Sequence, residues 1–212
     1  MGKCSLPLVD CRYFPLIGSF HAIELQVQLS SRSPVQVVGR LRTPRGYRPD
    51  SAAESGVTMS DTNAVKWLRA QGADFQVLEY TFTEIGADHA AEAVGWPLEA
   101  VCKTLLVEAS GKSFWIAIIP GDQRFDPRLM AAAIGQNHAD LAGREQAEKV
   151  TGYHIGGMSP FAMRRKLPVV IEESLLALDK ILVNGGRRGV LVELATEDLV
   201  HLLDAQTASI CR

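Results

Sequence analysis

The chain has 212 residues, of which 47% are hydrophobic and 22% charged, and its formal net charge is −2. This composition is typical of a globular protein with one substantial core, and no apolar run approaches the ~20 residues that a membrane-spanning helix needs. The charge is uneven: residues 1–58 hold seven Lys and Arg against four Asp and Glu, whereas residues 59–212 hold fifteen against twenty. We therefore do not expect residues 59–212 to hold nucleic acid through a generally basic surface, and any RNA contact must come from a local patch.

The first 58 residues differ from the rest of the chain. The segment "RLRTPRGYRPDSAAESG" is rich in Arg, Pro, Gly and Ser, which indicates a poorly ordered extension. Residues 22–29 alternate well enough for one short strand, but no neighbouring segment offers it a partner. Met59 stands just before a helix-start signal and is a candidate for the true start of translation. We therefore expect an N-terminal extension over residues 1–58 and a single domain over residues 59–212.

The cysteines and histidines indicate neither disulfides nor a metal site. Four scattered cysteines, without a C-x-x-C pair, are typical of reduced thiols in a cytoplasmic protein. The five histidines share no ligand spacing, and the phosphate-binding and dinucleotide-binding glycine motifs are absent from the sequence. We expect no metal, no cofactor, and neither a membrane nor DNA as a partner.

Helices and strands are interspersed along residues 59–212. Helices are predicted over residues 62–71, 87–94, 127–134, 144–150 and 197–203, with Asp126 and Thr196 as N-caps of the third and the last. Strands are predicted over residues 75–80, 105–107, 114–119, 167–171, 180–183 and 190–194. Because several strands are joined by hairpin turns, the pattern favours one α/β domain with a mixed, largely antiparallel sheet flanked by helices over a doubly wound parallel sheet.

A lysine at the entrance of an apolar strand is the first candidate for chemistry. Lys103 and Thr104 open the run Leu105–Val107, although lysine is a poor strand former and is costly to bury unpaired. A lone lysine at a strand end usually keeps its head in water. Cys102, next to it, is an alternative nucleophile if the ammonium stabilises a thiolate. Strand alternation sends the two side chains to opposite faces, however, which argues against that pairing.

Two glycine-rich loops could complete a pocket around Lys103. The loop "TGYHIGGMSP" (Thr151–Pro160) contains Gly156 and Gly157, which allow the backbone to come close to a ligand. The loop "NGGRRG" (Asn184–Gly189) is also a strong hairpin-turn signal. A lysine beside two loops with amide donors would suit the polarisation of an ester carbonyl.

Five segments together resemble the YbaK/EbsC family of free-standing editing domains, which are related to the insertion domain of bacterial prolyl-tRNA synthetase. They are "AVKWLRAQGADFQVLEY", "CKTLLVE", "TGYHIGGMSP", "RRKLPVVI" and "ILVNGGRRGVLVEL", in this order. The resemblance runs from about Thr62 to the C-terminus, and residues 1–58 have no counterpart.

The resemblance implies a trans-acting deacylase that hydrolyses the ester of a mischarged tRNA, with tRNA(Pro) carrying cysteine or another small amino acid as the first candidate. It implies that Lys103 is the essential residue, and that prolyl-tRNA synthetase is a candidate partner. The substrate-binding residues that it implies are Tyr80, Thr104, Gly156, Gly157, Ser159, Asn184 and Gly185. The attacking group would be an oriented water or the substrate's own thiol, and Lys103 would remain a cation.

Two positions depart from the cysteine-specific members of that family. Asn184 stands where they usually have serine, and Leu191 where they have aspartate. The amino acid removed is therefore open among cysteine, alanine, serine and small non-protein amino acids.

Basic residues near the two loops are the candidate contacts to tRNA phosphates. They are Arg164, Arg165, Lys166, Arg187 and Arg188. A solvated turn is the alternative interpretation of both runs. Two other functions stay open: a non-catalytic module that binds tRNA or a synthetase through the same pocket, and a thiol-dependent enzyme that uses Cys102. The presence of Lys103 favours the deacylase.

Overall fold

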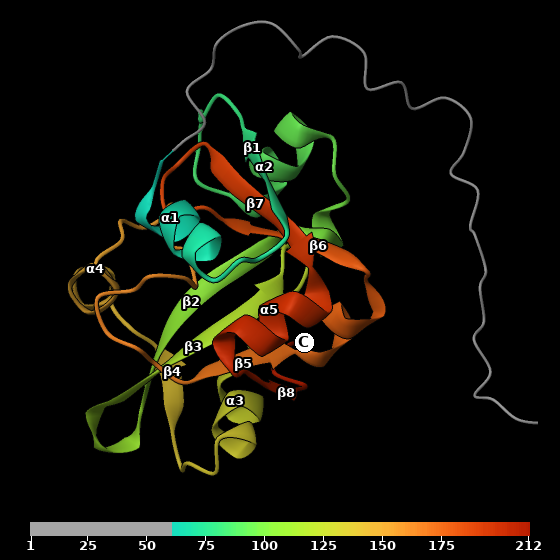
Figure 1. The fold of residues 1–212 in the computed structure, drawn as a ribbon. Coiled ribbons are helices and arrows are strands. Elements are labelled where there is room, and N and C mark those ends of the chain that lie inside the picture. The colour runs from blue at the N-terminus through green and yellow to red at the C-terminus, as the bar shows by residue number, and fades with distance from the viewer. Residues whose placement is uncertain (1–60) are drawn as a thin grey trace, which may run out of the picture. The chain divides into compact units, whose positions relative to one another are not determined.

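A computed structural model of the chain describes residues 61–212 (Figure 1). The predicted extension and the predicted strand at residues 22–29 lie outside the described residues. In the part described, no helix has the length and apolar character needed to cross a membrane. The helices are α1 (Asn63–Ala70), α2 (Ala87–Val94), α3 (Pro127–Ala133), α4 (Arg144–Thr151) and α5 (Thr196–Leu203). The strands are β1 (Phe75–Glu79), β2 (Cys102–Ala109), β3 (Ser113–Pro120), β4 (Ala139–Leu141), β5 (Val169–Glu172), β6 (Lys180–Asn184), β7 (Val190–Ala195) and β8 (Gln206–Ala208).

The strands form two sheets, which meet at one point. The smaller sheet has the order β1-β7-β6 and is antiparallel throughout. The larger has the order β4-β2-β3-β5-β8, in which β3–β5 and β5–β8 are the parallel pairs. A parallel bridge between Val101 and Leu182 joins β6 to the start of β2. The predicted α/β class with mixed, largely antiparallel pairing is confirmed. The strands divide between two sheets: the β6–β7 hairpin pairs with β1, and the β2–β3 hairpin pairs with β4 on one side and with β5 on the other.

The predicted helix ends are mostly confirmed by capping contacts. Thr62 caps α1 by accepting a hydrogen bond from Val65 N at 3.2 Å. Asp126 caps α3 in the same way, with Pro127 in the first turn. The prediction for Thr196 is wrong, because Ala195 is the N-cap of α5. Thr196 is buried and its hydroxyl donates to the Leu178 carbonyl at 2.6 Å, so it joins α5 to the segment between β5 and β6 instead.

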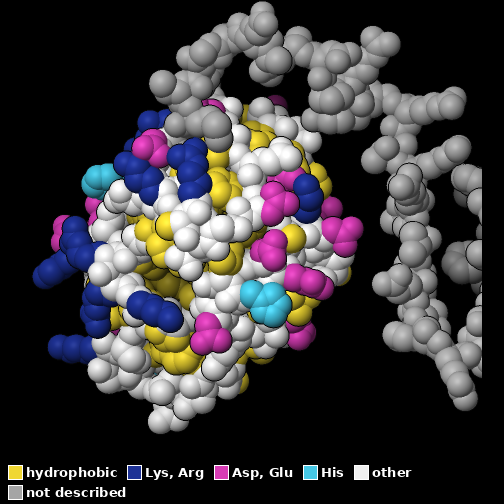
Figure 2. All heavy atoms as spheres, in the orientation of Figure 1, with side chains coloured by type: hydrophobic (Ala, Val, Ile, Leu, Met, Phe, Trp, Pro, Cys, Tyr) yellow, Lys and Arg dark blue, Asp and Glu magenta, His cyan; other side chains and the backbone are white. Residues whose placement is uncertain are grey.

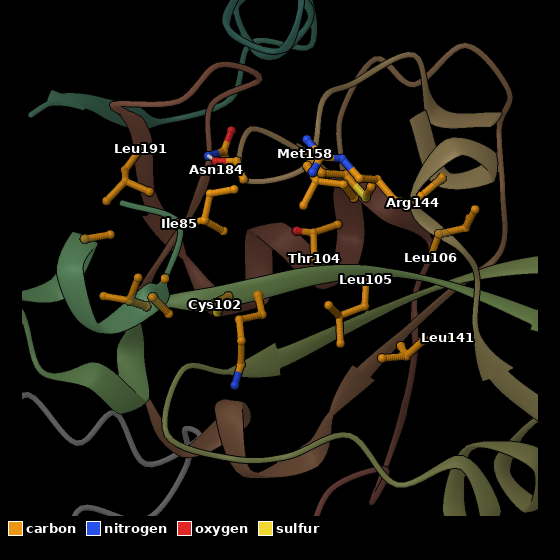
Figure 3. A pocket seen from close by; sticks show the side chains of 18 of the residues that line it. Ile85, Cys102, Thr104, Leu105, Leu106, Leu141, Arg144, Met158, Asn184 and Leu191 are labelled. Atoms are coloured by element: carbon orange, nitrogen blue, oxygen red, sulfur yellow. Dashed lines mark hydrogen bonds between the residues drawn. The ribbon is translucent and has the colours of Figure 1, made fainter. Parts of the chain in front are cut away.

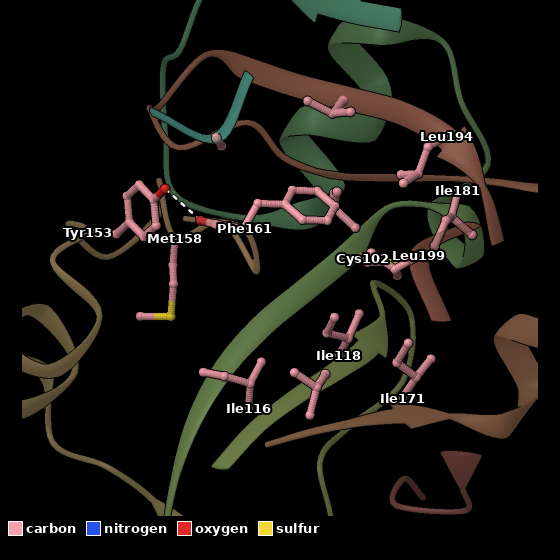
Figure 4. Close-up of a cluster of buried hydrophobic side chains, with 14 of the residues drawn as sticks. Cys102, Ile116, Ile118, Tyr153, Met158, Phe161, Ile171, Ile181, Leu194 and Leu199 are labelled. Carbon is pink, nitrogen blue, oxygen red and sulfur yellow. Dashed lines mark hydrogen bonds between the residues drawn. The ribbon is translucent and has the colours of Figure 1, made fainter. Parts of the chain in front are cut away.

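The main core lies between the two sheets and holds the glycine-rich loop Thr151–Pro160 in place (Figure 4). Tyr153 and Met158 of this loop are buried, together with Phe161 just after it. The Tyr153 hydroxyl donates to the Phe161 carbonyl at 2.7 Å, and the Phe161 ring stacks on Trp67 of α1 with centroids 5.5 Å apart. This packing fixes a long, glycine-containing loop beside the N-terminal half of β2.

Candidate functional site

A pocket of about 410 Å³ opens beside the N-terminal half of β2, where the two sheets meet (Figure 3). Strand β4 pairs with β2 only over Val107–Ala109, which leaves the earlier residues of β2 at the pocket wall. Figure 3 shows Leu191, Asn184 and Ile85 at one end of the pocket, Leu106, Leu141 and Arg144 at the other, and Thr104 between them. The remaining walls come from α2, from the start of α4 and from the glycine-rich loop.

The pocket brings together five of the eight side chains and glycines that the sequence marks as catalytic or substrate-binding. These are Tyr80, Lys103, Thr104, Gly156 and Asn184. They come from the end of β1, the start of β2, the glycine-rich loop and the end of β6, so the fold assembles them from more than 100 residues of sequence. Burial raises the pKa of Tyr80, which keeps its phenol protonated as a hydrogen-bond donor.

The other three predicted substrate-binding residues have structural contacts instead. Ser159 is fully buried and its hydroxyl accepts a hydrogen bond from Phe161 N at 3.3 Å. Gly185 donates to the Val190 carbonyl at 2.9 Å and closes the β6–β7 hairpin. Gly157 packs against the second glycine-rich loop: a Cβ there would lie 3.0 Å from Arg188 N. The two loops therefore meet through backbone contacts, and only the Gly156 side of the first one lines the pocket.

Lys103 is half-buried and its ammonium is held by main-chain carbonyls. Nζ donates to the carbonyl oxygens of Gly121 at 2.9 Å and of Gln123 at 2.6 Å, both in the turn after β3. Burial lowers the pKa of Lys103, while nearby Cys211 and Asp122 act to raise it. An ammonium has three N–H donors, so the two carbonyls leave one for a ligand. Lys103 is thus not a strand-end lysine with a purely solvated head.

Thr104 carries an unsatisfied polar atom next to that lysine. Within residues 61–212, its Oγ1 is a buried side-chain oxygen with no hydrogen-bond partner. Figure 3 shows Thr104 on the side of β2 that faces Asn184 and Met158. A buried hydroxyl without a partner costs roughly 1–3 kcal/mol. Such a group in a pocket indicates a place where a ligand supplies the missing hydrogen bond.

Asn184 and Leu191, the two departures from the cysteine-specific pattern, are cross-strand partners in the β6–β7 pair. The Asn184 amide donates to the Gly156 carbonyl at 3.2 Å and accepts from Gly186 N at 2.8 Å. It therefore joins the two glycine-rich loops. Leu191 is only 3% exposed and belongs to an apolar cluster with Ala90 and Val101. This end of the pocket, which we call the deep end, is lined by Ile85, Ala87, Ala90, Val101 and Leu191.

Cys102 lacks the properties of a nucleophile, although it borders the pocket. Its side chain is buried in the main core, and burial raises the pKa of its thiol far above the usual range. Its sulfur contacts the Ala100 carbonyl at 3.9 Å, and no cation lowers the pKa. The thiol therefore stays protonated at neutral pH, and the hypothesis of a thiol-dependent enzyme loses its chemical basis.

Three of the five predicted tRNA contacts, Arg188, Arg164 and Arg187, already contact other groups of the protein. Arg188 donates through Nε and Nη2 to the Ile155 carbonyl at 3.1 and 2.9 Å, and its guanidinium lies 5.3 Å from the Phe82 ring centroid. Arg164 donates to the Lys149 carbonyl at 3.0 Å. Arg187 lies 3.8 Å from Glu79 and lines a second hollow beside the pocket, with His154, Gly157, Gly186 and Arg188.

Arg165 and Lys166 are exposed. On the face shown in Figure 2, Lys and Arg side chains gather along one side and Asp and Glu along the other, with apolar surface between them. On this face the basic side chains therefore lie mainly along one flank, as a local RNA contact would require.

The residues at the other end of the pocket, which we call the open end, are not among those predicted from the sequence. Leu141 is 48% exposed there, and the exposed side chain of Arg144 makes a long ion pair with Glu148, at 3.6 Å. Arg144 is the first residue of α4. A cation at a helix N-terminus is opposed by the helix dipole, so an arginine in that place is the signal that could have singled it out.

Comparisons with known proteins identify the family. Residues 86–202 match the model of the aminoacyl-tRNA editing domain. A protein of Enterococcus faecalis, provisionally named Cys-tRNA(Pro)/Cys-tRNA(Cys) deacylase EbsC, is 30% identical over 155 residues, which are 72% of this chain and 94% of that protein. The multifunctional Ser/Thr-tRNA deacylase ProXp-y of Escherichia coli K12 is 29% identical over 150 residues, 68% of this chain and 89% of that protein.

Solved structures give the same result. One described provisionally as a trans-editing enzyme for prolyl-tRNA synthetase has a TM-score of 0.63 and 25% identity, and covers 72% of this chain and 99% of its own. The hypothetical protein APE2540 has a TM-score of 0.66 and 27% identity, over 70% of this chain and 98% of its own. The chain belongs to the aminoacyl-tRNA editing domain family, as its sequence motifs suggested.

Proposed function

We propose that this protein is a trans-acting deacylase that hydrolyses the ester bond of a mischarged aminoacyl-tRNA. The observation that carries the proposal is the pocket wall formed by successive residues of β2: Lys103, whose ammonium is held by two main-chain carbonyls, and Thr104, whose buried hydroxyl has no partner among the described residues. Membership of the editing family and the names of its relatives support the same reaction. Lys103 is the proposed catalytic residue, and Thr104 a substrate-binding residue.

The chemistry needs little more than these two groups. An aminoacyl ester is already activated, so the protein has mainly to orient it and to stabilise negative charge on its carbonyl oxygen. The remaining N–H of Lys103 is suited to that oxygen, and the Thr104 hydroxyl can hold the neighbouring part of the substrate. An oriented water, or a thiol carried by the substrate, would attack the carbonyl carbon and release the tRNA hydroxyl.

The two ends of the pocket give the substrate an orientation. The deep end is apolar, with Ala90, Val101 and Leu191 buried in its wall, which suits a small amino-acid side chain. The open end offers apolar surface at Leu105 and Leu141 and a cation at Arg144, which suits a nucleoside followed by a phosphate. The ester between them would then lie at Lys103 and Thr104. The tRNA would leave the pocket at Arg144, with Arg165, Lys166, Arg187 and part of the second hollow as further candidate contacts.

The lining of the deep end bears on which amino acid is removed. It contains no charged side chain, and the Asn184 amide is held by hydrogen bonds to Gly156 and Gly186, which leave it one N–H. A small side chain without a strong need for hydrogen bonds fits best, so we rank alanine and cysteine before serine. We keep tRNA(Pro) as the first candidate tRNA and prolyl-tRNA synthetase as the candidate partner, which would place the protein with translation in the cytoplasm.

A deacylation panel tests the proposal. The protein is mixed with tRNA(Pro) charged in turn with cysteine, alanine, serine and proline, beside a Lys103→Ala control. We expect at least one mischarged species to be lost in a Lys103-dependent manner while Pro-tRNA is spared. If no species is lost faster than with the control, while tRNA still binds in a titration, the protein is a non-catalytic binding module instead.

A further inference from the structure

The turn that holds Lys103 is itself closely packed against the chain. It follows β3 and includes Gly121 and Gln123, whose carbonyls accept the two hydrogen bonds from Nζ. A Cβ on Gly121 would lie 2.6 Å from the Leu98 carbonyl oxygen and 2.8 Å from that of Val101. Both obstacles are main-chain atoms of the segment that leads into β2, so neither can rotate away. Glycine is needed here for space, and any side chain would displace the turn.

The residues that follow the turn, Arg124 and Asp126, are held by main-chain hydrogen bonds to the C-terminal residues of the chain. Arg124 and Arg212 exchange main-chain hydrogen bonds of 3.3 and 2.9 Å. Asp126 N donates to the Ile210 carbonyl at 2.9 Å, and Ile210 N donates to the buried carboxylate of Glu172 at 2.7 Å. The two carbonyls that receive Lys103 are therefore fixed from both sides.

We propose that Gly121 is a positioning residue for Lys103: its missing side chain lets the turn sit where its carbonyls hold the Lys103 ammonium in one position beside the pocket. The inference rests on the proposed function for its catalytic consequence. Two carbonyl acceptors fix two N–H directions, and the tetrahedral ammonium then has its third direction set as well. Pre-set donors of this kind stabilise a developing oxyanion without rearrangement during the reaction.

The main test is Gly121→Ala, compared with Gly111→Ala. Gly111 lies in the turn at the opposite end of the β2–β3 hairpin and has a φ of 72°, and a Cβ there would meet no atom within 4 Å. An alanine at Gly111 strains the backbone and lowers stability without moving Lys103. We expect Gly121→Ala to lower kcat by roughly 10- to 100-fold with a smaller change in KM, since displacements of about 1 Å have such effects. Gly111→Ala should keep its kcat, and equal losses in both variants would overturn the proposal.

A double variant separates positioning from general damage. If Gly121 acts through Lys103, adding Gly121→Ala to Lys103→Ala should cause no further loss of rate. A further loss of the same size as in the wild-type background would show that Gly121 acts independently, and would contradict the proposal. Where Gly121→Ala does not fold, Lys103→Arg serves instead. It keeps the charge but cannot reproduce the three ammonium directions, so we expect it to be nearly as inactive as Lys103→Ala, and full activity would overturn the proposal.

A readout that needs no activity keeps this inference distinct from the proposed function. The rate at which an amine-reactive acetylating reagent modifies Lys103 is followed by peptide mass spectrometry, with the exposed Lys112 as an internal reference. Release from the carbonyls should make Lys103 react several-fold faster in Gly121→Ala and leave it unchanged in Gly111→Ala. An unchanged rate in Gly121→Ala overturns the positioning role. A failed deacylation panel with accelerated labelling would overturn the proposed function alone.

Discussion

The two ends of the pocket differ in burial and in the kind of side chain that they present. At the deep end, Ala90, Val101 and Leu191 are buried in one apolar cluster, and only Ile85, at the edge, is half exposed. At the open end, Leu141 is half exposed and Arg144 extends into solvent. A buried wall can discriminate by shape, because its side chains cannot move aside, whereas an exposed rim can only add affinity. The difference therefore separates choice of the amino acid, at the deep end, from attachment of the tRNA, at the open end.

The substitution with the largest expected effect on kcat is Lys103→Ala, which lies between the two ends of the pocket. Lys103→Ala removes the proposed donor to the carbonyl oxygen, and loss of one such donor costs about 10²–10³-fold in kcat. Both ends remain intact, so KM should change little. Single-turnover deacylation over a range of enzyme concentrations checks this. A loss confined to KM would make Lys103 a binding residue only.

Leu191→Ala should alter the deep end most. It leaves a cavity beside Ala90, so we expect a loss of about 2–4 kcal/mol in the free energy of unfolding. The wider pocket should also accept larger amino acids, such as valine, that the native protein spares. Urea unfolding and the deacylation panel measure the two effects. Leu175→Ala, fully buried in the main core, is the control: it should lose stability without changing the order of substrates.

Thr104→Val should lower activity without lowering stability. The hydroxyl has no partner among the described residues, so a methyl group of the same shape removes an unsatisfied polar atom. We expect thermal stability to be equal or higher and kcat/KM to fall by roughly tenfold, the size of one lost hydrogen bond. Thr104→Ser, which keeps the hydroxyl, should retain most activity. Full activity of the valine variant would show that the hydroxyl does not contact the substrate.

Arg144→Ala should have the smallest effect of the four. Removal of one cation at the open end should raise KM for aminoacyl-tRNA by a few-fold and reduce its dependence on salt, with kcat unchanged. Arg128→Ala removes an exposed charge on α3, which contributes no residue to the pocket, and should change neither value. If the two variants behave alike, the tRNA does not leave the pocket past Arg144.

The sequence predicts the elements well because their signals are local. The caps Thr62 and Asp126, the left-handed Gly95 after α2 and the hairpin β2–β3 each depend on a few neighbouring residues. The short strands β4 and β8 escape prediction, since three residues are too few to show alternation. A threonine at a helix start usually acts as a cap, whereas at Thr196 a tertiary contact with Leu178 takes the hydroxyl.

The contacts within the pocket can be predicted from the sequence only in part, because their signals are not local. Family motifs point to Lys103 and Asn184, but their hydrogen bonds go mostly to main-chain groups distant in sequence. Nearly every residue carries the same carbonyl and amide, so a sequence pattern cannot show which of them will meet a given side chain. The same limit applies to Arg188, whose guanidinium is occupied by the Ile155 carbonyl.

Binding of a non-hydrolysable substrate mimic tests the central claim most directly. The protein, labelled on its Ala and Leu methyl groups, is titrated with an adenosine that carries alanine through a 3′-amide in place of the ester. The account predicts that Ala90 and Leu191 at the deep end and Leu141 at the open end shift together and saturate with one affinity. Shifts confined to the second hollow, or none at either end, would contradict the claim that this pocket holds the aminoacyl end of tRNA.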